Sequence, residues 1–186
     1  MPLGKGFKRL KRVSFSLILV GLLVTLVCSV PVGAASLEGM AAQADAIVIT
    51  TPLSKVSYWD GKIIRTRATL QVEQVISGAL RGDRVTIVYD GGVVGKIGLK
   101  VSHGVRLPVG QKNLVFLKNM GQDFTVVNQS EGVFYILQGK EGEVVLPSEE
   151  MDNTRGVTVK SALGPSAMEK GIPLKEFLSI LRTFNH

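Results

Sequence analysis

Residues 63–76 have the sequence IIRTRATLQVEQVI, in which two kinds of side chain alternate along the chain. One set of alternate positions is mostly apolar: Ile64, Thr66, Ala68, Leu70, Val72 and Ile76. The other set is polar: Arg65, Arg67, Thr69, Gln71 and Glu73. A period of two predicts a β-strand with one buried face. Because the strand is long, we expect it to bend, as strands do when a sheet coils into a barrel.

Shorter segments with strand patterns lie on both sides of this stretch and are separated by turn residues. They cover Ala46–Thr50, Val85–Tyr89, Val93–Val101, Asn113–Lys118, Phe124–Val127, Val133–Leu137 and Val144–Leu146. We expect Pro52 to mark a kink or an edge before the first strand resumes through Val56 and Tyr58. Residues 59–62, Trp-Asp-Gly-Lys, predict a hairpin turn. The pattern predicts an all-β barrel or sandwich, with one coiled or bulged strand at Val93–Val101.

Two helices are expected at the ends of this β region. Ser36 is a plausible N-cap for a short helix to Ala44, and Leu37, Met40, Ala41 and Ala44 share one face. A C-terminal amphipathic helix begins near Pro173, with Leu174, Phe177, Leu178 and Leu181 on its apolar face. We therefore divide the chain into a β-barrel domain at 36–146, a loop or linker at 147–172 and a terminal helix at 173–186.

The first 35 residues have the pattern of a secretory signal peptide. Five basic residues and no acidic residue precede Val13, and an uncharged apolar run covers residues 13–30. Pro31 and small residues follow, so we expect cleavage after Ala34 or Ala35. The alternative is an uncleaved membrane anchor through residues 13–30. Both interpretations place the remainder outside the cytoplasm, secreted or anchored by this segment.

The remainder of the chain is nearly neutral. Without the leader, 17 Lys and Arg oppose 15 Asp and Glu, a net charge of +2, and no cysteine is left because Cys28 is the single one. This balance gives no argument for nucleic acid or for an anionic membrane as a partner. With His103 and His186 as the two histidines, a tetrahedral zinc site is excluded. We expect no metal and no cofactor.

Catalytic patterns are weak. His103 has no Gly-x-Ser-x-Gly elbow beside it, so we assign no catalytic residue. The glycines at 91, 92, 95 and 98 are like those of a phosphate loop, but a strand rather than a helix is expected to follow, which favours bends. Acidic residues that could hold calcium match no EF-hand spacing, and we interpret them as solvated loop charges: Glu141, Glu143, Glu149, Glu150 and Asp152.

One surface feature favours binding. Tyr58 and Trp59 stand at the predicted hairpin tip, and Arg65 and Arg67 return on the polar face. Together they predict an aromatic and basic ligand-binding patch. The alternative is a turn tryptophan folded onto its own hairpin, with the arginine stems beside it.

Several segments resemble a group of uncharacterised bacterial exported proteins. They are Ala44-Asp45-Ala46-Ile47-Val48, the long strand ending at Ser77-Gly78, and residues 95–117. The group's pattern includes Ala-Asp-x-Ile-Val, Gly-Gly-x-x-Gly and Val-Ser-Gly; here His103 precedes the last glycine and Gln111 replaces a glutamate. The same opening and long strand are distantly similar to the netrin-like module, which implies a closed or partly open OB-like β barrel. Inhibitors with that module depend on cysteines that this chain lacks.

We therefore expect a non-enzymatic binding module in the cell envelope or outside the cell, with a protein or a glycan as its partner. The netrin-like resemblance implies an alternative, a protease-associated or protease-inhibiting domain. A second alternative is a hydrolase that acts through acidic residues brought together by the fold.

Overall fold

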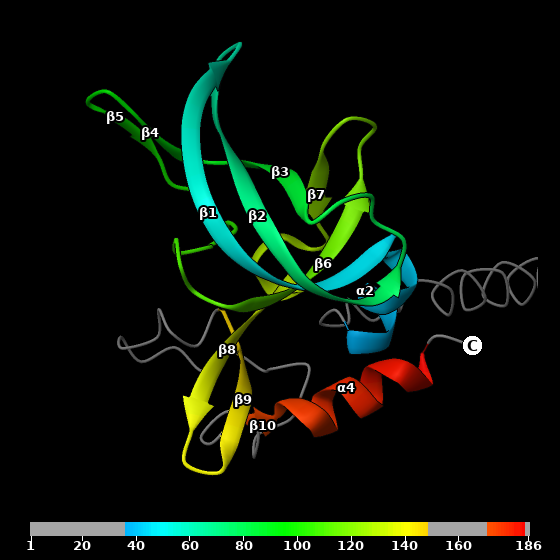
Figure 1. Cartoon of the computed structure of the whole chain (residues 1–186). Helices are drawn as coiled ribbons and strands as arrows, with labels where there is room; N and C mark the ends of the chain where they lie inside the picture. Colours follow the sequence, from blue (N-terminus) through cyan, green and yellow to red (C-terminus); the bar gives the residue numbers. More distant parts are fainter. Residues whose placement is uncertain (1–35, 149–170, 185–186) are drawn as a thin grey trace, which may run out of the picture. The chain divides into compact units, whose positions relative to one another are not determined.

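The computed structural model describes residues 36–148 and 171–184 (Figure 1). The predictions for the leader, for Glu149, Glu150 and Asp152, and for most of the linker lie outside these residues. The elements in chain order are α2 (Leu37–Gln43), β1 (Ala46–Asp60), β2 (Ile63–Gly78), β3 (Arg84–Asp90), β4 (Gly92–Val94), β5 (Ile97–Leu99), β6 (Asn113–Asn119), β7 (Phe124–Val126), the 3-10 helix η1 (Gln129–Gly132), β8 (Val133–Gly139), β9 (Gly142–Pro147), β10 (Ile172–Pro173) and α4 (Leu174–Thr183).

Five strands close into a barrel. Their order is β1-β2-β3-β7-β6, and β6 pairs back with β1 to complete the ring. Every neighbouring pair is antiparallel except β3 and β7, which run parallel where Ile87 meets Phe124. The mainly β, OB-like barrel predicted from the sequence is confirmed, and it is closed.

The hairpin of β1 and β2 is the longest feature of the fold and extends past the barrel at one end (Figure 1). Its two-residue turn contains Gly61, whose φ of 62° suits glycine. Register shifts interrupt the β1–β2 ladder at three places, one of them between Pro52 and Ser54. Such bulges increase strand twist and bending, which lets one pair of strands both wall the barrel and reach beyond it.

Alternate side chains of β1 and β6 enter two different hydrophobic cores. Val48 and Val115 lie in the barrel interior with Ala68, Leu70 and Ile87. Their neighbours on these strands enter a second core beneath the helices: Ile47, Ile49, Leu114 and Phe116. The β1–β6 pair is therefore a wall buried on both faces, which explains why its sequence is continuously apolar rather than alternating.

Both predicted helices are present and cover the second core. The Ser36 Oγ accepts a hydrogen bond from the Gly39 N–H at 3.0 Å, which caps α2 as expected. In α4, Phe177 is fully buried, and its ring centre lies 5.1 Å from that of Phe134. Phe134 in turn contacts Phe116 at 5.8 Å between ring centres. This row of rings fixes α4 to the barrel wall.

The single coiled strand predicted at Val93–Val101 is wrong. The structure has a second, small hairpin there, in which β4 pairs with β5 from Gly92–Leu99 to Val94–Ile97. Gly95 forms its turn with a φ of 61°. Strands of three residues are too short to show an alternating pattern in the sequence. Without that pattern, the glycines of the turn look like those of a single bulged strand.

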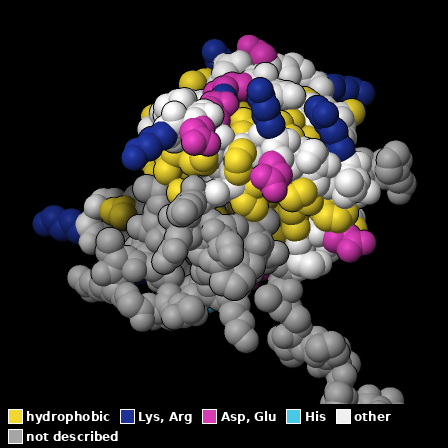
Figure 2. Space-filling model, turned by 90° about the horizontal axis from the view of Figure 1, so that it is seen from below, with side chains coloured by type: hydrophobic (Ala, Val, Ile, Leu, Met, Phe, Trp, Pro, Cys, Tyr) yellow, Lys and Arg dark blue, Asp and Glu magenta, His cyan; other side chains and the backbone are white. Residues whose placement is uncertain are grey.

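Residues 34–186 form a compact unit, separate from residues 1–33. Among the described residues, both hydrophobic cores are built from residues from Leu37 onward, so residues 34–186 carry the described core themselves. Over the described ranges, no helix combines the length and apolarity that crossing a membrane demands. The face in Figure 2 mixes Lys and Arg with Asp and Glu among hydrophobic side chains.

Candidate functional site

The β1–β2 hairpin carries all four residues of the predicted binding patch. Tyr58 pairs with Arg65, and Arg67 follows two residues later on β2. Trp59 pairs instead with Ile64. Because paired residues share a face and successive residues alternate, Tyr58, Arg65 and Arg67 come together while Trp59 lies on the opposite face. The predicted patch is thus divided between the two faces of the hairpin.

Arg67 links the hairpin to the loop between β6 and β7. Its guanidinium carbon lies 5.6 Å from the centre of the Tyr58 ring, within cation–π range. Its Nη2 donates to Asp123 Oδ2 at 3.0 Å. Asp123 closes that loop just before β7 begins. One side chain therefore holds together two segments that are 56 residues apart in the sequence.

Arg65 is enclosed by carboxylates. Its Nε donates to Asp90 Oδ1 at 3.0 Å, and its Nη1 contacts Asp60 Oδ2. The hydrogen bond to Asp90, followed by the charge of Asp60, raises the pKa of Arg65. The guanidinium stays charged and is neutralised locally, so this face of the hairpin presents paired ions rather than free positive charge.

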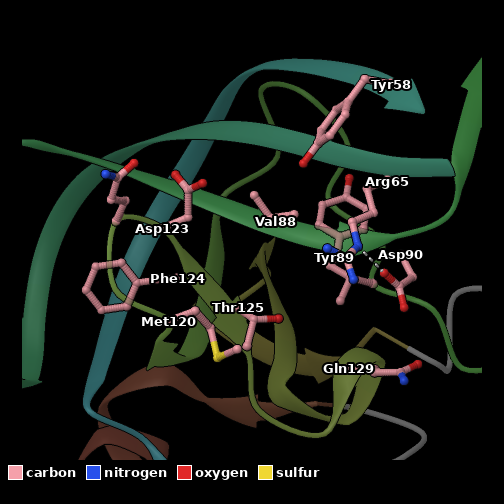
Figure 3. Close-up of a pocket in the computed structure, with 12 residues that line it drawn as sticks. Tyr58, Arg65, Val88, Tyr89, Asp90, Met120, Asp123, Phe124, Thr125 and Gln129 are labelled. Carbon is pink, nitrogen blue, oxygen red and sulfur yellow. Dashed lines mark hydrogen bonds and ion pairs between the residues drawn. The ribbon is translucent and has the colours of Figure 1, made fainter. Parts of the chain in front are cut away.

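A pocket of about 580 Å³ opens between the hairpin, β3 and the β6–β7 loop (Figure 3). Tyr58 and Arg65 line one side together with Tyr89 and Asp90, and the opposite side includes Met120, Asp123 and Phe124. Its volume falls within the usual range for small-ligand sites, about 300–1,000 Å³. The lining residues come from segments that are far apart in the sequence.

Tyr89 is the most perturbed titratable group of the pocket. Burial raises its pKa to about 12. The phenol is therefore neutral at physiological pH and available as a hydrogen-bond donor. Figure 3 shows its ring beside Arg65 and below Tyr58, on the wall of the pocket.

The remaining candidates from the sequence fall elsewhere. Trp59 is 49% exposed, so it is not folded into a core. His103 occupies a loop with a φ of 55°, and its carbonyl oxygen accepts from the Ser130 N–H. Within residues 36–148 and 171–184, no three His, Cys, Asp or Glu side chains are placed to share a metal ion. Glu143 forms an ion pair with Lys112 at 2.9 Å.

The sequence did not predict most of this pocket, since only Tyr58 and Arg65 of its lining belong to the predicted patch. Asp90 and Asp123 look like ordinary turn residues, and Phe124 looks like a core strand residue. Each becomes part of the pocket because β3 and β7 are neighbours in the barrel, a parallel pairing that local periodicity does not encode. The available signal was weak: Asp90 ends β3 and Asp123 precedes β7, and nothing in the sequence pairs these two strands.

No family model, curated protein or solved structure matches the chain. The function must therefore be argued from the site.

Proposed function

We propose that this domain is a non-enzymatic binding module outside the cytoplasm, and that it holds a neutral saccharide in the pocket beside Tyr58 and Arg65. The observation that carries the proposal is the composition of that pocket. Aromatic rings lie next to guanidinium groups that are already paired with carboxylates. With two arginines against three aspartates, the cluster offers hydrogen bonds but no free positive charge for an anionic ligand.

The ion pairs favour an uncharged ligand. Arg65 faces Asp60 and Asp90, and Arg67 faces Asp123. An anionic ligand would have to displace these carboxylates, and a cationic ligand would have to displace the arginines. A neutral ligand with many hydroxyl groups does neither, because each hydroxyl both donates and accepts. The pairs also leave lone pairs and N–H groups at their rims to bond such hydroxyls.

The aromatic residues favour a ligand with flat apolar faces. Tyr58 and Phe124 contribute ring surface from opposite sides of the pocket, and Tyr89 adds a neutral phenol on the side of Tyr58. A sugar ring has apolar faces and polar edges, which suits rings flanked by hydrogen-bonding groups. The pocket also lies where OB barrels bind oligosaccharides, on the face of strands 2 and 3 between two loops, although that is an analogy of fold alone.

The proposal is tested by titrating residues 34–186 with neutral and anionic oligosaccharides and measuring heat. We expect a neutral oligosaccharide to bind, and Arg65→Gln to weaken it about tenfold, because Arg65 lines the pocket and a charge-assisted hydrogen bond contributes about 1.5 kcal/mol. Arg182→Gln on the exposed side of α4 is the matched control and should bind like the unmodified protein.

Two results would oppose the proposal. Binding that survives Arg65→Gln unchanged would place the ligand outside this pocket, and an absence of saccharide binding would show that the ligand is not a saccharide. Incubation with the same oligosaccharides checks the enzymatic alternative, since Asp90 and Asp123 line one pocket. Release of reducing sugar that is lost in Asp90→Asn and Asp123→Asn would identify a carboxylate hydrolase instead.

A further inference from the structure

A second pocket, of about 560 Å³, lies on the other side of the β1–β2 hairpin. Ser57 and Thr66 of the hairpin face it, β4 and β5 border it, and the loop at residues 100–108 closes it. Tyr89, Asp90 and Val105 line both pockets. The two sites therefore share these three residues, and their other lining residues differ.

This second pocket is basic. Lys55, Lys100 and Arg106 line it, against Asp90 as the single acidic residue of the lining. Asp90 is already bonded to Arg65 at 3.0 Å from the other side. Neither Lys55 nor Lys100 has an ion-pair partner among residues 36–148 and 171–184. The net charge of +2 for residues 36–186 does not reveal this cluster, and positive and negative side chains are mixed on the face drawn in Figure 2.

The hairpin of β4 and β5 at the mouth of the pocket is apolar and exposed. Val93 is 66% exposed and Ile97 is 57% exposed, and Leu99 is also open to solvent. Figure 1 shows this hairpin projecting from the barrel beside the β1–β2 hairpin. Lys96 lies in its turn and Lys100 follows its second strand. Exposed apolar side chains with lysines between them are typical of surfaces that enter the membrane interface.

The small hairpin is firmly attached at its base. The Val93 N–H donates to Ser57 Oγ at 3.3 Å. Gly92 packs so closely that a Cβ atom there would lie 2.3 Å from Ser57 Oγ and 2.4 Å from Thr66 Oγ1. The basic pocket and the apolar hairpin therefore keep a fixed relation to each other, as a composite lipid site requires.

We propose that this face of the domain docks on an anionic phospholipid bilayer, with a phosphate headgroup in the basic pocket and the β4–β5 hairpin among the headgroups. Charge complementarity selects the anionic group. The apolar hairpin at the same mouth selects a lipid over a free phosphate, because a soluble ion would leave Val93, Ile97 and Leu99 in water. This inference is independent of the saccharide site, which lies across the hairpin.

The test is sedimentation of residues 34–186 with vesicles of phosphatidylglycerol or of phosphatidylcholine. We expect binding to phosphatidylglycerol vesicles alone, with an affinity that falls as salt rises. Lysines near an anionic membrane contribute about 1 kcal/mol each, which is about fivefold in the partition coefficient. The double variant Lys55→Gln, Lys100→Gln should therefore bind about 25-fold more weakly.

Ile97→Ser tests the apolar part and should also reduce vesicle binding without changing the melting temperature, since Ile97 packs against no core. The matched controls are Lys140→Gln in the turn after β8 and Val75→Ser on β2, both exposed and distant from the pocket. Both controls should bind like the unmodified protein.

Four results would overturn the proposal. The first is equal binding to both vesicle types, and the second is an absence of binding to either. The third is complete competition by soluble glycerol phosphate together with an unchanged Ile97→Ser variant, which would assign the pocket to a free phosphate. The fourth is a dimer in analytical ultracentrifugation that Ile97→Ser dissociates, which would assign the hairpin to a second copy of the chain.

Discussion

Replacing Tyr89 with phenylalanine tests the shared wall of the two pockets. Burial raises the pKa of Tyr89 to about 12, whereas an unfolded chain has a tyrosine pKa near 10. Between these values the unfolded state releases the phenolic proton and the folded state keeps it. The contribution of Tyr89 to the free energy of unfolding is therefore fully present below pH 10 and is lost as the pH rises through 12.

The size of the effect follows from the same difference. A separation of about two pH units corresponds to at most about 2.7 kcal/mol, and partial exposure of Tyr89 reduces it through solvent screening to about 1 kcal/mol. Between pH 9 and pH 12, the free energy of unfolding should therefore fall by about 1 kcal/mol less in Tyr89→Phe than in the unmodified protein.

Two assays measure this difference. Absorbance at 295 nm follows tyrosine ionisation, and the titration of the unmodified protein minus that of Tyr89→Phe should have its midpoint above pH 10, because burial raises the pKa of Tyr89. Urea unfolding at several alkaline pH values gives the stability difference. A difference titration with a midpoint near 10 would show that Tyr89 is solvated, and would refute the burial of this shared residue.

Two further substitutions test the fold around the sites. Phe177→Ala should lower the free energy of unfolding by about 3–5 kcal/mol, because this fully buried ring joins α4 to Phe134, whereas Ser179→Ala on the same helix should leave it nearly unchanged in urea unfolding. Gly92→Ala should cost more stability than Gly95→Ala and should speed hydrogen exchange in β4, because only Gly92 would place its Cβ against Ser57 and Thr66.

Local patterns were sufficient for most of the fold. The alternation from Ile64 to Leu70 matches the buried positions of β2, and the cap at Ser36 and the apolar face of the terminal helix are both present. These features depend on neighbours within a few residues, where periodicity and capping act.

The candidate site was only half predictable. Trp59 and Tyr58 were expected at a turn, where their directions are not fixed; the strand instead continues to Asp60 and sends them to opposite faces. The partner of Arg67, Asp123, comes from a loop that a parallel strand pairing brings alongside. The basic pocket depends on Lys55, which is distant in sequence from Lys100 and Arg106 and meets them only in the closed barrel.

The wall formed by β1 and β6 has a consequence for how this chain resists unfolding without disulfides. Residues 46–50 are hydrogen-bonded to β2 on one edge and to β6 on the other, while both of their faces are covered by packed side chains. Unfolding of either the core under the helices or the core inside the barrel therefore exposes apolar side chains of the other core to water. The two cores should melt in one transition, and the amides of Ile47 and Val48 should be the last to exchange with solvent.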